Sequence, residues 1–274
     1  MSIFLTGNGI PIEYASLSRQ GGREHNEDAC GYCVTDAGSF FVVCDGAGGH
    51  GGGEVASETA VRTALSAYNS APVFSTENIK ILMAQISTAI RYGQSLSHQL
   101  SQMSATITGL FINPQGEHAL WAHLGDTRLY LFRRGQFTQL TKDHSVVQSY
   151  IDAGLAEPGS SRTHQDRNLL FAALGMPEIV DVEINETGLR IQEGDAFLLC
   201  TDGFWEPVLE EEMLDQLVRS SAAQEWLLRM EHLIETRARP GHDNYSAMAI
   251  WMGSPSDVTM PWSKFEADGI NNAV

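Results

Sequence analysis

Short apolar or alternating segments, separated by turn residues, recur along most of the chain and constrain its fold more than any other feature. Turn signals such as TDAGS (35–39) and NPQGE (113–117) lie between consecutive segments. This succession favours strands that are joined directly and pair antiparallel. The predicted strands are EYASLS (13–18), CGYCV (30–34), FFVVC (40–44), ATITGLFI (105–112), HALWAHL (118–124), RLYLFR (128–133), VDVEI (180–184), AFLLC (196–200) and SAMAIWM (246–252).

Segments with helical periodicity come in two pairs. The second pair is predicted over EEEMLDQLVRS (210–220) and AAQEWLLRMEHLIETRA (222–238) near the end of the chain. Helix pairs among antiparallel strands indicate a layered α+β domain and not a doubly wound sheet. In the first pair, residues at helical spacing share one face of each helix: Val61, Ala64, Leu65 and Tyr68, then Ile79, Leu82, Met83, Ile86 and Ile90.

Composition narrows the class of partner. The chain has 274 residues, enough for one large domain, with 34 acidic residues against 17 basic ones and a net charge of −17. The acidic excess argues against a nucleic-acid partner, because phosphate backbones attract basic surfaces. No apolar run has the length of a membrane span, and the N-terminal residues lack the pattern of a signal peptide. We therefore expect a cytoplasmic protein with no membrane partner.

The four cysteines offer a possible redox or zinc motif. Cys30 and Cys33 form a C-x-x-C, but no second pair accompanies them, and the motif lies in a predicted strand instead of opening a helix. Packed, reduced thiols are the favoured interpretation of these two residues and of Cys44 and Cys200.

Acidic residues stand at the ends of several predicted strands. One such acid is commonly a turn residue, and Asp-Gly is a frequent turn pair. Several acids meeting at one edge of packed sheets would repel each other unless cations neutralise them. An all-oxygen site favours Mg²⁺, Mn²⁺ or Ca²⁺ over zinc, and the calcium-binding EF-hand pattern is absent. The acids concerned are Glu27, Asp28, Asp45, Asp126, Asp202 and Asp243.

A glycine cluster follows the first of these strands. In DGAGGHGGGE, six of the eight residues after Asp45 are glycine, which costs backbone entropy and requires a reason. A plain strand-to-helix turn is one explanation. In the other, the Gly46 carbonyl faces a cation and the next glycines let the backbone pass beneath the site. Arg23, four residues before Glu27, is placed in sequence to bind a phosphate group.

Six motifs resemble, in order and approximate spacing, those of the metal-dependent protein phosphatases, the PPM or type 2C serine/threonine family. The short glycine-rich motif is similar to that of the bacterial branch. The resemblance covers Tyr14 to Met252. The motifs are REHNED (23–28), VVCDGAGGHGGGEVAS (42–57), GDTRLYLFR (125–133), LTKDHS (140–145), LCTDGFWE (199–206) and HDNYSAMAI (242–250).

The resemblance implies a four-layer α-β-β-α sandwich of two antiparallel sheets flanked by helix pairs, over residues 1–252. Residues 253–274 would form a polar tail, partly disordered. The implied activity is Mn²⁺- or Mg²⁺-dependent hydrolysis of phosphoserine and phosphothreonine in proteins, by direct attack of a metal-activated water. The implied partners are phosphorylated proteins, among them a serine/threonine kinase or its targets, and the chain is expected to be a monomer.

The resemblance also implies individual roles. Asp45 would bridge two metal ions, and Gly46 would offer its carbonyl to one of them. Glu27 would bind largely through water, and Asp28 would support metal-bound waters. The remaining matches are Arg23 as the phosphate-binding and catalytic arginine, Asp202 and Asp243 as ligands of the second metal, and Asp126, with Asp202, as a ligand of a weaker third metal.

Two further features carry expectations. Some family members have a leaving-group histidine directly after the Asp-Gly, where this chain has Ala47. His50 or a metal-bound water remain as alternative acids, and His25, His123 and His144 are interpreted as structural or solvated. Residues 154–168 match the family's mobile flap. Arg162 and Arg167 in this loop could meet acidic or phosphorylated partners, but solvated charges are the favoured interpretation of both.

Two rival functions remain open from the sequence. A catalytically weak relative acting as a regulatory scaffold is expected to lose a metal ligand, yet every matched position carries its acid. A metal-dependent nuclease is disfavoured by the acidic composition and the lack of basic-aromatic patches.

Overall fold

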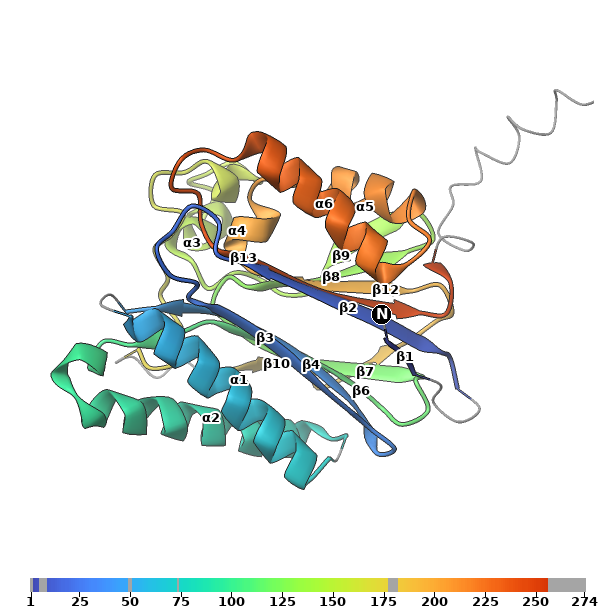
Figure 1. The fold of residues 1–274 in the computed structure, drawn as a ribbon, viewed down its shortest axis with the longest axis horizontal. Helices are drawn as coiled ribbons and strands as arrows, with labels where there is room; N and C mark the ends of the chain where they lie inside the picture. The colour runs from blue at the N-terminus through green and yellow to red at the C-terminus, as the bar shows by residue number, and fades with distance from the viewer. Residues whose placement is uncertain (1, 5–8, 49–50, 73, 177–181, 256–274) are drawn as a thin grey trace, which may run out of the picture.

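The computed structural model describes residues 2–4, 9–48, 51–72, 74–176 and 182–255. Its strands form two antiparallel sheets that pack face to face, with a helix pair on each outer surface (Figure 1). The expected α-β-β-α sandwich is therefore confirmed. The predicted tail lies outside the described residues except for Gly253–Pro255.

The first sheet has the order β1-β2-β13-β12-β8-β9. Helices α5 (Glu210–Val218) and α6 (Ala223–Arg237) cover its outer face (Figure 1). Its strands are β1 (Ser2–Phe4), β2 (Ile12–Arg19), β13 (Tyr245–Met252), β12 (Ala196–Cys200), β8 (Arg128–Arg133) and β9 (Gln136–Gln139).

The second sheet has the order β10-β7-β6-β4-β3, with β11 also paired to β7 and β5 to β4. Helices α1 (Gly52–Ser70) and α2 (Thr76–Leu96) cover its outer face (Figure 1). Its strands are β3 (Asp28–Thr35), β4 (Gly38–Ala47), β5 (Ser104–Ala105), β6 (Ile107–Ile112), β7 (His118–Leu124), β10 (Glu183–Ile184) and β11 (Leu189–Arg190).

The hydrophobic core has three parts, one between the two sheets and one between each sheet and its helix pair. Alternation of side chains along the strands explains this division. In β4, Phe41 and Val43 point between the sheets, whereas Phe40 and Val42 point toward α1 and α2. Residues i and i+2 share one face of a strand, so β4 is apolar on both faces and buried on both. The remaining elements are α3 (Val146–Asp152), α4 (Asp202–Trp205) and the 3₁₀ turns His98–Leu100 and Ser160–Arg162.

The strand predictions missed the short elements β1, β9 and β11 and extended β10 too far toward its start; residues 180–181 of that prediction lie outside the described residues. Cys30 and Cys33 point to opposite faces of β3, one toward each core. All four cysteines are free thiols, and burial raises the pKa of Cys30 to about 11. Packed, reduced thiols therefore describe them correctly.

Candidate functional site

The acids predicted at strand termini meet at one end of the sandwich, the left end in Figure 1. Asp45 lies near the end of β4, directly opposite Asp28 at the start of β3. Asp126 occupies the turn from β7 in one sheet to β8 in the other. Asp202 opens α4 after β12, and Asp243 precedes β13. Both sheets therefore contribute carboxylates to the same place.

A cleft of about 400 Å³ occupies this end of the sandwich. All but one of the residues to which the resemblance gives a role line it; Asp28 does not. The lining residues among them are Arg23, Glu27, Asp45, Gly46, Asp126, Asp202 and Asp243.

The second half of the glycine cluster makes room for two of these oxygen donors. A side chain on Gly53, in the first turn of α1, would place its Cβ 2.6 Å from the Gly46 carbonyl oxygen and 2.5 Å from Glu27 Oε1. Both oxygens therefore converge over the bare Cα of Gly53. The Gly46 N–H also donates to the Glu27 carbonyl at 3.0 Å, which holds the two segments together. Close approach of oxygen donors is the physical reason for glycine here.

Burial and mutual repulsion make the ionised form of these clustered carboxylates unfavourable when no cation is bound. Burial raises the pKa of Asp45 well above its usual range, and Asp202, Asp28 and Asp126 raise it further. Burial likewise raises the pKa of Asp202 to about 6, with Asp243 as the next cause. Bound cations would remove this penalty.

One atom in the cluster has an unmet requirement. Asp202 Oδ1 is buried and has no hydrogen-bond partner in the described part of the chain. A buried oxygen without a donor is unfavourable, and a divalent cation satisfies it. The orphaned oxygen, the converging carboxylates and the Gly46 carbonyl together form an all-oxygen donor set that fits Mn²⁺ or Mg²⁺.

Asp28 lies behind the cleft. Its side chain is buried, and its Oδ2 accepts a hydrogen bond of 2.9 Å from the Thr201 hydroxyl. Burial raises its pKa to about 7, although the Thr201 hydrogen bond acts in the opposite direction. Asp28 thus has the position of a supporting residue beside Asp45.

Arg23 reaches the cleft from the loop between β2 and β3. Its Nη2 donates to Asp243 Oδ2 at 2.7 Å, and its side chain is half exposed. Its pKa is raised by this hydrogen bond and by the charge of Asp243. A cation tethered at the rim, with most of its donors unused, suits the capture of an anionic group.

Two residues without a predicted role position the acids. Thr106 exchanges hydrogen bonds with Asp45: its N–H donates to the Asp45 carbonyl at 2.8 Å, and its Oγ1 accepts from the Asp45 N–H at 3.0 Å. Asn244 Oδ1 accepts from the Glu27 N–H at 2.8 Å, and Asn244 Nδ2 donates to the Gln20 and His25 carbonyls. Nothing in the sequence marks Thr106; Asn244 is marked only by its place next to Asp243.

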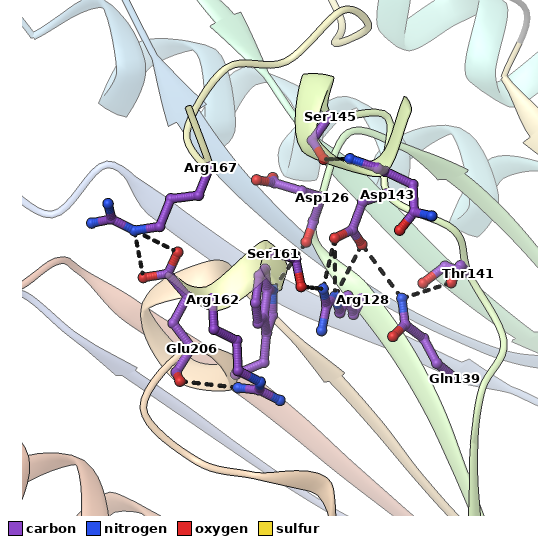
Figure 2. Close-up of polar contacts among 12 residues, drawn as sticks. Asp126, Arg128, Gln139, Thr141, Asp143, Ser145, Ser161, Arg162, Arg167 and Glu206 are labelled. Atoms are coloured by element: carbon purple, nitrogen blue, oxygen red, sulfur yellow. Dashed lines mark hydrogen bonds and ion pairs between the residues drawn. The ribbon is translucent and has the colours of Figure 1, made fainter. Parts of the chain in front are cut away.

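The prediction of a solvated charge is wrong for Arg162, whereas Arg167 is partly exposed and pairs with Glu206. Arg162 is largely buried: its Nη1 donates to the carbonyls of Glu206 and Val208, and its Nη2 lies 2.8 Å from Glu210 Oε2. Arg167 Nε lies 3.1 Å from Glu206 Oε1 (Figure 2). The loop therefore packs against the segment that begins with Asp202.

A buried stack of side chains supports the turn that holds Asp126. The Trp205 indole N–H donates to the Asp126 carbonyl at 3.0 Å. The Arg128 guanidinium lies 3.4 Å above the Trp205 ring. It donates three hydrogen bonds to Asp143, at 2.9, 3.3 and 2.7 Å (Figure 2). This arrangement, a cation–π contact plus a bidentate ion pair, fixes the turn.

His123, His144 and Glu183 form a separate group whose potential ligand atoms lie within 4.8 Å of one another. The two imidazoles are nearly parallel, 17° apart, so their in-plane lone pairs do not converge. His144 Nδ1 accepts from the Gly125 N–H, the reverse of the donating role that a metal-ligating histidine usually gives its second nitrogen. The contacts agree with the structural role expected for His123 and His144. His50 lies outside the described residues.

Comparisons with known proteins place this arrangement in a family. The profile of the family described as Protein phosphatase 2C matches residues 17–239. The serine/threonine protein phosphatase PstP of Mycobacterium tuberculosis is 32% identical over 240 residues, which are 85% of this chain and 43% of PstP. The serine/threonine phosphatase stp of Listeria innocua is 31% identical over 83% of this chain and 90% of its own length.

Solved structures agree. A crystal structure of the M. tuberculosis serine/threonine phosphatase PstP/Ppp superimposes with a TM-score of 0.78 at 28% identity, covering 88% of this chain and 99% of that one. A structure of the PstP catalytic domain in complex with two manganese ions superimposes with a TM-score of 0.76. The chain belongs to the protein phosphatase 2C family, of the bacterial PPM type. It spans less than half of the length of PstP.

Proposed function

We propose that this chain is a Mn²⁺- or Mg²⁺-dependent phosphatase that hydrolyses phosphoserine and phosphothreonine in proteins. The observation that carries the proposal is the convergence of Asp45, Asp202 and Asp243 from two sheets on one cleft, with Arg23 at its rim. Among PPM relatives, the PstP catalytic domain is described in complex with two manganese ions.

The residues divide the work between cation binding and phosphate binding. Asp45 and the Gly46 carbonyl would hold one cation, and Asp45, Asp202 and Asp243 the other; Glu27 and Asp28 would position water, and Asp126 would complete a weaker third site. When bound, the cations supply Lewis-acid activation of water and offset the charge of the phosphate. Arg23 orients the phosphate monoester by charge-assisted hydrogen bonds. Thr106 and Asn244 hold Asp45 and the Glu27 backbone in place.

We further propose that the chain counteracts a serine/threonine kinase and works as a monomer. Its described residues contain no helix that is long and apolar enough to cross a bilayer.

The test measures phosphate release from a phosphothreonine peptide, first with added Mn²⁺ or Mg²⁺ and then after EDTA has removed the cation. We expect activity that requires added cation and disappears with EDTA, and an Asp45→Asn variant that folds but has lost at least about three orders of magnitude in rate, as expected when an essential catalytic group is removed. Full activity in the chelated protein, or in Asp45→Asn, would contradict the mechanism. An inactive wild type that still binds phosphoproteins would support the scaffold alternative, and cleavage of DNA in place of the peptide would support the nuclease.

A further inference from the structure

A second depression lies beside the catalytic cleft and continues from it. Its volume is about 380 Å³, and it shares Arg23, Asn168 and Asp243 with the cleft. One wall is the end of the 154–168 loop, and the other is the end of α6 with the segment leading to β13. We call this depression the arginine groove. A peptide whose phosphorylated residue enters the cleft would lay its neighbouring residues in it.

Five arginines line the groove, in a protein whose net charge is −17. Two of them serve the fold. Arg162 is held by Glu210 and by two carbonyls, and Arg237 by Glu212 and the Pro207 carbonyl. These two arginines have few donors left for a ligand, and they bring the flanking segments together.

The other three, Arg23, Arg167 and Arg239, have unused donors. Arg167 contacts Glu206 through Nε (Figure 2), and within the described residues its two terminal nitrogens donate no hydrogen bond. Arg239 is exposed, and within the described ranges no ion pair or hydrogen bond engages its guanidinium; its carbonyl contacts the His242 imidazole at 3.0 Å. Among the described residues, two carboxylates line the groove, Glu206 and Asp243, and each already faces an arginine. The groove therefore presents unneutralised cationic donors next to the site where the phosphate would bind.

Resting on the function proposed above, we infer that the arginine groove binds an acidic side chain of the substrate, close in sequence to the phosphorylated residue. Arg239 and Arg167 are the specificity-determining residues, and Arg23 remains with the phosphate. The phosphatase thus prefers phosphorylation sites flanked by aspartate or glutamate. A second phosphate at the same place would present the same anionic chemistry, so the two sources are separated by experiment.

The experiment compares kcat/KM at saturating Mn²⁺ for phosphothreonine peptides that differ at one flanking position. Glutamate, glutamine, lysine and phosphoserine are placed in turn at each position that flanks the phosphothreonine, on its N-terminal and on its C-terminal side. We expect the wild-type chain to prefer glutamate to glutamine at one or more positions by about two- to fivefold, the range for one exposed ion pair. Raising the salt concentration should reduce the preference.

Variants assign the effect to the groove. Arg239→Gln should remove most of the glutamate preference, and Arg239→Glu should turn it into a preference for lysine. Arg219→Gln is the matched control, because Arg219 directly follows α5, forms an exposed pair with Asp215 and does not line the groove. Its glutamate preference should equal that of the wild type.

The outcomes separate this inference from the proposed function. If the wild type hydrolyses none of the phosphothreonine peptides, the proposed function fails. If peptides are hydrolysed but the glutamate preference is absent, or is unchanged in both Arg239 variants, the inference about the groove is wrong. A preference for phosphoserine without one for glutamate would identify a second phosphate as the ligand and overturn the assignment to an acidic residue.

Discussion

Replacing Gly53 by alanine should have two opposite effects: it stabilises helix α1 locally, and it creates a steric clash with the Gly46 carbonyl and Glu27 at the site. Alanine is the better helix former, by about 1 kcal/mol in a helix interior and less in a first turn. The new Cβ would lie 2.6 Å from the Gly46 carbonyl oxygen, where ordinary contact begins near 3.4 Å, so the carbonyl must retreat by about 0.8 Å. Overpacking of this kind costs about 1–3 kcal/mol. The steric cost therefore outweighs the gain in helix stability. The groups displaced, the Gly46 carbonyl and the Glu27 carboxylate, are both expected to bind the cations.

The neighbouring Gly52 provides the control. A Cβ on Gly52 would meet only Met103 at 3.5 Å and the Gln99 carbonyl at 3.9 Å, both ordinary contacts. Gly52→Ala should therefore be neutral or stabilising by up to about 1 kcal/mol and keep its manganese affinity. Gly53→Ala should lower the stability of the cation-free protein by about 1 kcal/mol and weaken manganese binding at least about tenfold.

The measurements are denaturant unfolding in EDTA and calorimetric titration with Mn²⁺. A tenfold weaker affinity reduces the stabilisation by saturating manganese by about 1.4 kcal/mol, so thermal shift provides a second readout. If Gly53→Ala bound manganese and hydrolysed a phosphopeptide as well as Gly52→Ala does, the Gly46 carbonyl and Glu27 would not be part of the cation site.

Three further outcomes are expected. Arg23→Ala should raise KM for phosphopeptides more than it weakens manganese binding, and Arg23→Lys should recover only part of the loss; steady-state kinetics with an unchanged KM would remove Arg23 from the site. The folded-state pKa values of Asp28 and Asp202, about 7 and about 6, lie above the unfolded value, so the cation-free protein should lose stability as pH rises from about 4 to about 7. Manganese should therefore raise the melting temperature more at pH 7.5 than at pH 5.5. An equal increase in melting temperature at both pH values would argue against this coupling. Arg128→Met leaves buried Asp143 without its partner and should cost about 3–5 kcal/mol in denaturant unfolding, whereas a loss below about 1 kcal/mol would show that the Arg128–Trp205 stack does not support the Asp126 turn.

The sequence alone was sufficient for the elements that carry the acids. Alternation and turn residues marked β4, β12 and β13, and the motif order then identified Asp45, Asp202 and Asp243 at their ends. These signals are local: strand periodicity, the Asp-Gly pairs and the glycine cluster are all visible within about ten residues of chain. The short strands β1, β9 and β11 were missed because two to four residues are too few to show a period.

Tertiary structure decided which side chains meet. The composition of the 154–168 loop indicated exposure, yet Arg162 is held by Glu210 on α5. Asp28 accepts a hydrogen bond from Thr201, which follows β12 of the opposite sheet. Likewise, only the approach of α1 to β4 shows that Gly53 is bare because Glu27 and Gly46 converge on it. The physical reason is that chain periodicity determines which face of an element a residue occupies, while its neighbour across the cleft depends on how the two sheets pack.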